Sequence, residues 1–194
     1  MPSKADLRQQ LLPRLAAFDP TERAVANEQL CARLLDQPEV AEAEKLAVYA
    51  AWGWELDLSA VTEATLTRGA TVLYPRWTPT GYEMVPVSSF ADLAPGKHGI
   101  CEPRNSLAPI ADHRDLTWII PGLAFSPSGA RLGRGAGDYD RLLEHSCGVR
   151  IGVCRDWQLQ TSLPQGPFDI LMTHVATDKQ WIATPTPLLK GTHL

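Results

Sequence analysis

Residues 129–143, GARLGRGAGDYDRLL, follow the apolar run LTWII at residues 116–120, and these two stretches decide the fold that the sequence predicts. Three glycines at alternate positions, Gly133, Gly135 and Gly137, let backbone N–H groups approach a ligand closely. An apolar strand, a glycine-rich loop and the start of a helix, in this order, are typical of the ligand-binding edge of an α/β sheet. The pattern therefore predicts a binding loop beyond the carboxyl end of a buried strand.

Predicted helices and strands alternate along the rest of the chain. Helices are expected at 4–18, 21–36 and 57–68, and strands at 46–52, 70–75, 82–87, 116–120, 149–154 and within 170–177. Ser3 and Asp6 are expected to cap the first helix, Pro13 to kink it, Pro75 to end a strand, and residues 88–115 to form an irregular connection. The alternation predicts an α/β fold with a mostly parallel sheet and helices on its faces. We expect residues 1–194 to form one domain.

The composition is that of a soluble globular protein. Lysines and arginines number 18 against 22 aspartates and glutamates, which gives a formal net charge of −4 at pH 7. This balance argues against a broad surface for nucleic acid or a membrane, but it permits a local basic pocket. The sequence shows neither a signal peptide nor a membrane-spanning apolar run. Four cysteines without a CxxC pair predict reduced thiols and a cytoplasmic location.

The charges around the glycine-rich loop favour an anionic ligand. A helix that begins near Asp138 or Tyr139 would direct its N-terminal N–H groups towards the loop. Arg131 and Arg134 add charge-assisted donors, and Asp140 is a carboxylate of the kind that binds Mg²⁺ beside phosphates. The loop matches neither the Walker GxxxxGK[ST] pattern nor GxGxxG. Two interpretations stay open at this point: a phosphate-binding loop, or a flexible surface turn with solvated charges.

Motifs along most of the chain resemble the 5-formyltetrahydrofolate cyclo-ligase family, also called the methenyltetrahydrofolate synthetases. Residues 121–143, PGLAFSPSGARLGRGAGDYDRLL, are similar to the family signature P-G-hydrophobic-A-F-D followed by G-x-R-L-G-[RY]-G-x-G-Y-Y-D-R. Further matches stand in the family's order: Lys4-x-x-Leu7-Arg8, Glu55 in WGWELDL, Pro75, Met84, Gly99-Ile100-x-Glu102-Pro103, Gln158, Pro164, Asp169 and Thr177. The resemblance covers residues 4 to about 178.

This resemblance implies a fold and an activity. The implied fold is a three-layer α/β/α sandwich related to the ribose-5-phosphate isomerase and CoA-transferase group. The implied enzyme is a ligase of one-carbon metabolism that uses ATP and Mg²⁺ to convert 5-formyltetrahydrofolate to 5,10-methenyltetrahydrofolate. In the implied reaction, phosphoryl transfer to the formyl oxygen is expected to activate the substrate, with release of ADP and phosphate. The expected partner is a small-molecule reduced folate, and the protein is expected to be a monomer. Trp52, Trp54 and Tyr82 stay open between stacking on the folate rings and core packing.

The resemblance also implies roles for individual residues. Arg134 is expected to be catalytic, by stabilising charge on the transferring phosphoryl group. ATP is expected to bind Lys4, Arg8, Arg131, Leu132, Gly133, Arg134, Gly135, Ala136, Gly137, Asp138 and Tyr139. Arg8, Glu55 and Tyr139 are expected to bind the folate, and Asp140 and Asp169 are expected to bind Mg²⁺.

Four positions depart from the family pattern, and one of them is Ala136, which stands where Lys or Gly is common. Asp138 stands where the first Tyr of Gly-Tyr-Tyr-Asp is usual, Ser126 stands where Asp is usual, and Phe168 stands where His precedes Asp169. The carboxylate of Asp138 is expected to weaken anion binding unless Mg²⁺ or Arg134 neutralises it. Two alternatives stay open: a diverged paralogue that uses ATP on another formamide or carboxamide, and a folate-binding protein without turnover.

Overall fold

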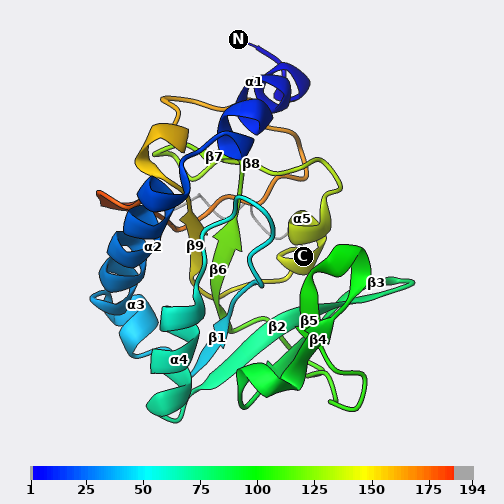
Figure 1. The fold of residues 1–194 in the computed structure, drawn as a ribbon. Helices are drawn as coiled ribbons and strands as arrows, with labels where there is room; N and C mark the ends of the chain where they lie inside the picture. Colours follow the sequence, from blue (N-terminus) through cyan, green and yellow to red (C-terminus); the bar gives the residue numbers. More distant parts are fainter. Residues whose placement is uncertain (1, 186–194) are drawn as a thin grey trace.

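A seven-stranded sheet is the centre of the computed structural model, which describes residues 2–185 (Figure 1). Its strands, in their order across the sheet, are β11 (Trp181–Ala183), β10 (His174–Ala176), β9 (Arg150–Val153), β6 (Thr117–Pro121), β1 (Lys45–Ala47), β2 (Thr71–Thr78) and β3 (Gly81–Val87). The five inner strands are parallel, whereas the edge strands β3 and β11 are antiparallel to their neighbours. The predicted α/β fold with a mostly parallel sheet is confirmed.

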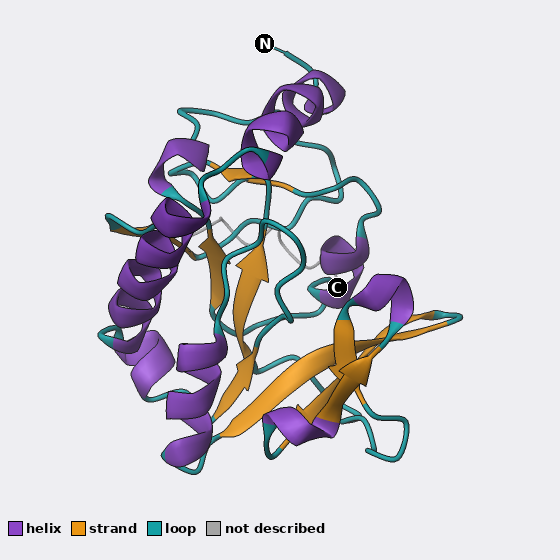
Figure 2. Cartoon of the chain, viewed as in Figure 1, coloured by secondary structure: helices purple, strands orange, loops and turns teal. Residues whose placement is uncertain are grey.

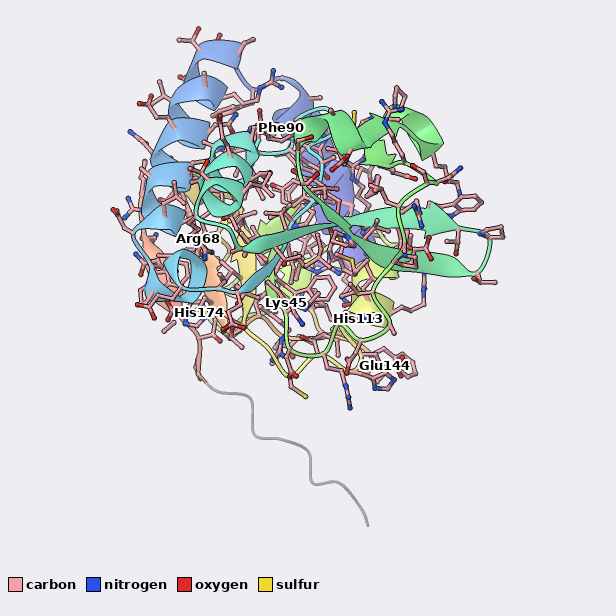
Figure 3. The ribbon with its side chains drawn as sticks, turned by 90° about the horizontal axis from the view of Figure 1, so that it is seen from below. Lys45, Arg68, Phe90, His113, Glu144 and His174 are labelled. Carbon is pink, nitrogen blue, oxygen red and sulfur yellow. The ribbon has the colours of Figure 1, made fainter. Side chains whose placement is uncertain are left out.

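Helices cover one face of this sheet more fully than the other (Figure 2). The helices are α1 (Lys4–Ala16), α2 (Pro20–Leu35), α3 (Pro38–Ala41), α4 (Ser59–Thr67) and α5 (Asp138–Leu142). Leu30 and Leu34 of α2 and Val61 of α4 are fully buried in the core cluster of the first face. Arg68, next to the end of α4, lies beside α3 (Figure 3), where its guanidinium donates to the carbonyl of Val40 at 3.0 Å. The opposite face is covered by the five-residue α5 and by loops, so the third layer of the sandwich is thin.

Two small hairpins lie outside the main sheet. One pairs β4 (Leu93–Pro95) with β5 (Cys101–Pro103), inside the segment that was expected to be irregular throughout. The other pairs β7 (Ala124–Phe125) with β8 (Arg131–Leu132) and leads directly into the glycine-rich loop. Ala124 and Leu132 of this hairpin pack against the apolar face of α1 in a separate core cluster. This hairpin therefore joins the loop to the N-terminal helix. No helix within residues 2–185 is long and apolar enough to cross a membrane.

Pro75 lies inside β2, so the prediction that it ends this strand is wrong. Pro75 stands opposite Met84 of β3, and the carbonyl of Met84 accepts a hydrogen bond from Ile110 N–H at 2.9 Å, on the side away from β2. The position where Pro75 lacks an N–H therefore faces away from β3 as well. On that side β1 has already ended at Ala47, which pairs with Leu73. A proline here costs the sheet no hydrogen bond. The strand predicted at 46–52 is also shorter than expected, because β1 ends at Ala47.

Replacing Gly152 is expected to destabilise the fold, because Phe125 lies directly on β9. A Cβ atom at Gly152 would come within 2.2 Å of Cε1 of Phe125, whose side chain is fully buried. Gly152→Ala should therefore lower the free energy of unfolding by about 1–3 kcal/mol in urea denaturation. The control is Gly166→Ala, whose new methyl group would meet its nearest neighbour at 3.7 Å. Equal losses in the two variants would contradict this packing.

Candidate active site

A cavity of about 1180 Å³ opens beyond the carboxyl ends of the parallel strands. Residues that follow β1 and β6, among them Tyr49 and Gly122, form part of its wall. The predicted site residues that line it are Lys4, Arg8, Glu55, Arg131, Gly133, Arg134, Gly135, Ala136, Gly137, Asp138, Tyr139, Asp140 and Asp169. Leu132 is not among the lining residues, because side chains alternate along β8 and that of Leu132 is buried in the core beneath α1.

The first two turns of α1 supply two cations to the cavity. Ser3 and Asp6 form the predicted capping box, and α1 continues through Pro13 to Ala16. Because the apolar face of α1 packs on the β7–β8 hairpin, Lys4 and Arg8, one helical turn apart, both reach the cavity. Lys4 Nζ forms an ion pair with Asp169, and Arg8 Nε donates to the carbonyl of Gly133 at 2.9 Å.

The glycine-rich loop lies close against two guanidinium groups. A Cβ atom at Gly133 would come within 2.7 Å of Nη1 of Arg131, and one at Gly135 would come within 3.3 Å of Cζ of Arg8. Gly135 and Gly137 have φ angles of 110° and 74°, which side-chain-bearing residues rarely adopt. The glycines are therefore needed both for the path of the loop and for its contact with the two cations.

Arg131 and Asp140 form the most buried ion pair of the cavity wall. Nη2 of Arg131 lies 3.2 Å from Asp140 Oδ2, and the Arg131 side chain is 7% exposed. Its Cζ lies 5.3 Å from the centre of the Tyr139 ring. Asp140 Oδ1 also accepts a hydrogen bond from Ile170 N–H at 3.4 Å, which brings Asp140 to the segment that carries Asp169. The fold thus gathers the two predicted metal ligands on one wall.

Arg134 contacts the part of the cavity that was expected to bind folate. Its Nη2 lies 3.2 Å from Glu55 Oε1, and its Cζ lies 4.2 Å from the ring centre of Trp52 and 4.8 Å from that of Trp54. Glu55 Oε2 accepts a hydrogen bond from Trp52 N–H at 3.0 Å. Trp52, Trp54 and Tyr82 all line the cavity. The faces of the two tryptophans are thus in contact with a cation in this structure.

The pKa values of two carboxyl groups of the cavity are shifted in opposite directions. Burial raises the pKa of Glu55 above the ordinary 4.5, although Trp52 N–H and Arg134 favour the charged form. Partial burial also acts to raise the pKa of Asp169, but the hydrogen bonds from Lys4 and Gly166 N–H outweigh it, and the net pKa falls below 3.8. Burial, followed by the charge of Glu55, raises the pKa of Tyr139, so this phenol stays neutral.

Asp138 is paired with a cation that the sequence analysis did not assign to the site. Nη2 of Arg141 donates to Asp138 Oδ1, and Nη1 of Arg141 donates to the Ala136 carbonyl at 3.0 Å. Arg141 is thus the cation that partners Asp138 among the described residues, whereas Arg134 pairs with Glu55. The i,i+3 spacing of Asp138 and Arg141 on a predicted helix was the available signal.

Lys97, Trp77 and Phe168 are among the further lining residues that were not expected in the site. Lys97 Nζ lies 3.6 Å from the ring centre of Trp77 at one side of the cavity. Phe168, one of the departures from the family pattern, also lines it and is 84% exposed. Lys97 and Trp77 belong to segments without a sequence motif, and they join the cavity because the β4–β5 hairpin packs against β2.

The fold and the cavity define a class of protein: an α/β protein with a cation-rich, aromatic-lined site at the carboxyl edge of its sheet. The sequence profile described as the 5-formyltetrahydrofolate cyclo-ligase family matches residues 1–178, and the chain belongs to this family.

Relatives of known name support this assignment. An Escherichia coli protein named 5-formyltetrahydrofolate cyclo-ligase is 28% identical over 176 residues, which are 87% of this chain and 97% of that protein. A Mycolicibacterium smegmatis protein of the same name is 50% identical over 66 residues, 33% of this chain and 34% of that protein. The NMR structure of Aquifex aeolicus 5,10-methenyltetrahydrofolate synthetase has a TM-score of 0.83 and 28% identity, and covers 98% of this chain and 97% of its own.

Neutralising Glu55 and Asp169 is expected to change stability with opposite signs at pH 7. Because folding raises the pKa of Glu55, this group stabilises the folded state fully below its unfolded-state pKa. Its contribution to the free energy of unfolding is lost as the pH rises through its folded-state pKa. Glu55→Gln should therefore raise the Tm at pH 7, and the difference should shrink below pH 4.5. The lowered pKa of Asp169 gives a contribution that is present above its unfolded-state pKa and is lost as the pH falls.

Asp169→Asn should accordingly lower the Tm at pH 7, with a gap that closes below pH 3.8. Thermal melts of both variants and the wild type between about pH 3 and pH 7 measure both effects. A shift of the two Tm values in the same direction at pH 7 would contradict this electrostatic description.

Proposed function

We propose that the protein is a 5-formyltetrahydrofolate cyclo-ligase that uses ATP and Mg²⁺. It converts 5-formyltetrahydrofolate to 5,10-methenyltetrahydrofolate and releases ADP and phosphate. The observation that carries this proposal is the convergence of Lys4, Arg8, Arg131 and Arg134 on the glycine-rich loop in one cavity. Family membership and the names of the relatives support the folate substrate.

The residues of the loop fit a polyphosphate. Arg131 Nε is buried without a hydrogen-bond partner among the described residues, so this donor is available to a ligand. Residues 133–137 line the cavity, and a side chain at Gly133 or Gly135 would fill the space beside the guanidiniums of Arg131 and Arg8. We propose that Lys4, Arg8, Arg131 and the loop bind the phosphates of ATP by charge-assisted hydrogen bonds.

Asp140 and Asp169 fit a Mg²⁺ ion that is held jointly by protein and nucleotide. Mg²⁺ commonly takes one or two carboxylates and completes its shell with water and phosphate oxygens. Within residues 2–185 no group of three or more His, Cys, Asp or Glu side chains could hold a metal ion, so most ligands would have to come from the nucleotide and water. Bound Mg²⁺ supplies charge neutralisation on the phosphates.

The formyl group determines what the protein has to do. Its amide-like carbonyl is a poor electrophile, and its oxygen has to leave for the ring to close. The formyl oxygen attacks the γ-phosphorus and ADP leaves. N10 then attacks the formyl carbon and loses its proton to solvent, and the carbon–oxygen bond breaks with release of phosphate. We propose that Arg134 stabilises the transferring phosphoryl group, and that Glu55, Arg8 and Tyr139 hold the folate so that its oxygen points to the loop.

The remaining parts of the proposal concern the state of the protein. We propose one domain and a monomer that acts in the cytoplasm. All four cysteines are free thiols in the structure, a state that a reducing compartment maintains.

One assay tests the function. Pure protein is incubated with 5-formyltetrahydrofolate, ATP and Mg²⁺, and methenyl absorbance and ADP are followed together. We expect both products in equal amounts. No ATP-dependent product at high enzyme concentration would refute the proposal. ADP release with a different formamide would favour a diverged paralogue, and tight folate binding without ADP would favour a binding protein.

Removing the Arg134 guanidinium is expected to damage the chemical step. Arg134→Ala should lower kcat by on the order of a hundredfold or more, because a preorganised charge in the transition state is lost. The matched control is Arg114→Ala, since the Arg114 side chain is 62% exposed and pairs with Asp112 away from the cavity. An unchanged kcat in Arg134→Ala would remove this residue from the mechanism.

The Asp138–Arg141 pair gives a second kinetic prediction. Arg141→Met leaves the Asp138 charge unpaired beside the loop and should raise the KM for ATP by about two- to fivefold. The double variant Asp138→Asn with Arg141→Met should recover most of this loss. Asp138→Tyr alone is expected to leave activity equal or raise it. A double variant that binds ATP no better than Arg141→Met would show that the charge of Asp138 is not what Arg141 masks.

A further inference from the structure

Arg155, two residues after the end of β9, has a buried cationic side chain behind the cavity. The residue is 1% exposed, and its guanidinium forms no ion pair with a carboxylate of the described residues. Its Nε is also buried without a hydrogen-bond partner within residues 2–185. Burial, followed by repulsion from Arg23, lowers the pKa of Arg155 from its ordinary value. A charge in this position costs folding free energy.

The guanidinium contacts two segments that carry the predicted site residues. Nη2 of Arg155 donates to the carbonyl of Trp54 at 3.0 Å, next to Glu55 in the turn that follows β1. Its Cζ lies 4.7 Å from the ring centre of Phe18, in the link between α1 and α2. The same side chain therefore contacts the turn that carries Glu55 and the segment that follows α1.

Residues near Arg155 make further contacts between the segment after β9 and the elements around the cavity. The Phe18 ring packs against Trp157 with ring centres 6.0 Å apart, and Arg14 of α1 lies 4.1 Å from the Trp157 ring centre. These contacts tie the end of α1 to the segment after β9. The backbone N–H of Arg155 donates to Gln158 Oε1 at 2.9 Å, and Gln158 Nε2 donates to the Leu123 carbonyl at 3.0 Å. The loop after β6 is thus held by the same segment.

We propose that Arg155 is a positioning residue for the folate side of the site. Its guanidinium holds the turn at residues 52–55 and thereby fixes Glu55 relative to the cations of α1. The proposal rests on the proposed function for its kinetic consequences, whereas its effect on the turn stands on the structure alone. A packing role does not account for the guanidinium, because methionine has a similar length and no charge to bury.

The test compares Arg155→Met with Arg155→Lys and a matched control, Arg150→Met. Arg150 is the first residue of β9 and, like Arg155, donates to backbone carbonyls, including that of Leu171 at 3.0 Å, but it does not line the cavity. Three properties are measured for each protein: the Tm, the hydrogen exchange of the amides at residues 52–56, and kcat and KM for 5-formyltetrahydrofolate. Exchange reports on the turn whether or not the protein turns over this substrate.

Arg155→Met should keep or raise the Tm while the amides at 52–56 exchange about tenfold faster, since a hydrogen bond from a charged donor is lost. The KM for folate should rise by about tenfold and kcat should change much less, because the turn is proposed to hold the bound folate and not the transferring phosphoryl group. Arg155→Lys should recover part of both losses. Arg150→Met should lower the Tm and leave exchange at 52–56 and the KM unchanged.

Several outcomes would overturn the proposal. A protein that no longer folds, or a strongly lowered Tm, in Arg155→Met would assign Arg155 a structural role. Unchanged exchange at 52–56 would show that Arg155 does not hold the turn. Faster exchange with an unchanged KM would show that Arg155 fixes the turn but that this does not affect folate binding. If the wild type does not turn over 5-formyltetrahydrofolate, the proposed function fails, and exchange alone then decides whether Arg155 fixes the turn.

Discussion

The mutual repulsion of four cations in one cavity is the constraint on which the site depends. Like charges in one cleft repel one another, and each of these cations lies beside an anionic or polar partner. The partners come from four places: Asp169 for Lys4, the Gly133 carbonyl for Arg8, Asp140 for Arg131 and Glu55 for Arg134. The docking of α1, the path of the glycine-rich loop and the position of the turn after β1 all serve these contacts. Four cations against three carboxylates give this set of contacts a net positive charge, which suits the polyphosphate of the proposed function.

These contacts also join the two halves of the proposed reaction. Arg134 is held between Trp52 and Trp54 and bonds to Glu55, although its proposed task concerns the phosphoryl group. A flat ring that stacks on these tryptophans would compete with the guanidinium for the same surface. In the proposed reaction, a folate and the phosphates would therefore contact Arg134 from two sides. The buried Arg155 supports the same turn from behind.

Local pattern was enough to predict most of the elements. The family resemblance, and not local pattern, gave most of the site residues, and all of those except Leu132 line the cavity. Strand and helix order, the capping of α1 and the loop at the carboxyl edge follow from periodicity, glycine and cap residues in short windows. Pro75 could not be placed correctly, because its tolerance depends on where the neighbouring strand ends. Leu132 was included with its loop although strand alternation turns it into the core. The burial of Arg155 had no signal, because its contacts, Phe18 and Trp54, are remote in sequence.

The fate of the formyl oxygen tests the proposed chemistry most directly. The substrate is prepared with ¹⁸O in its formyl group and converted in the presence of ATP, and the label is followed by mass spectrometry of the phosphate. Phosphoryl activation within this cavity predicts one labelled oxygen in each phosphate that is released. Label that appears in water or formate, with unlabelled phosphate, would contradict it.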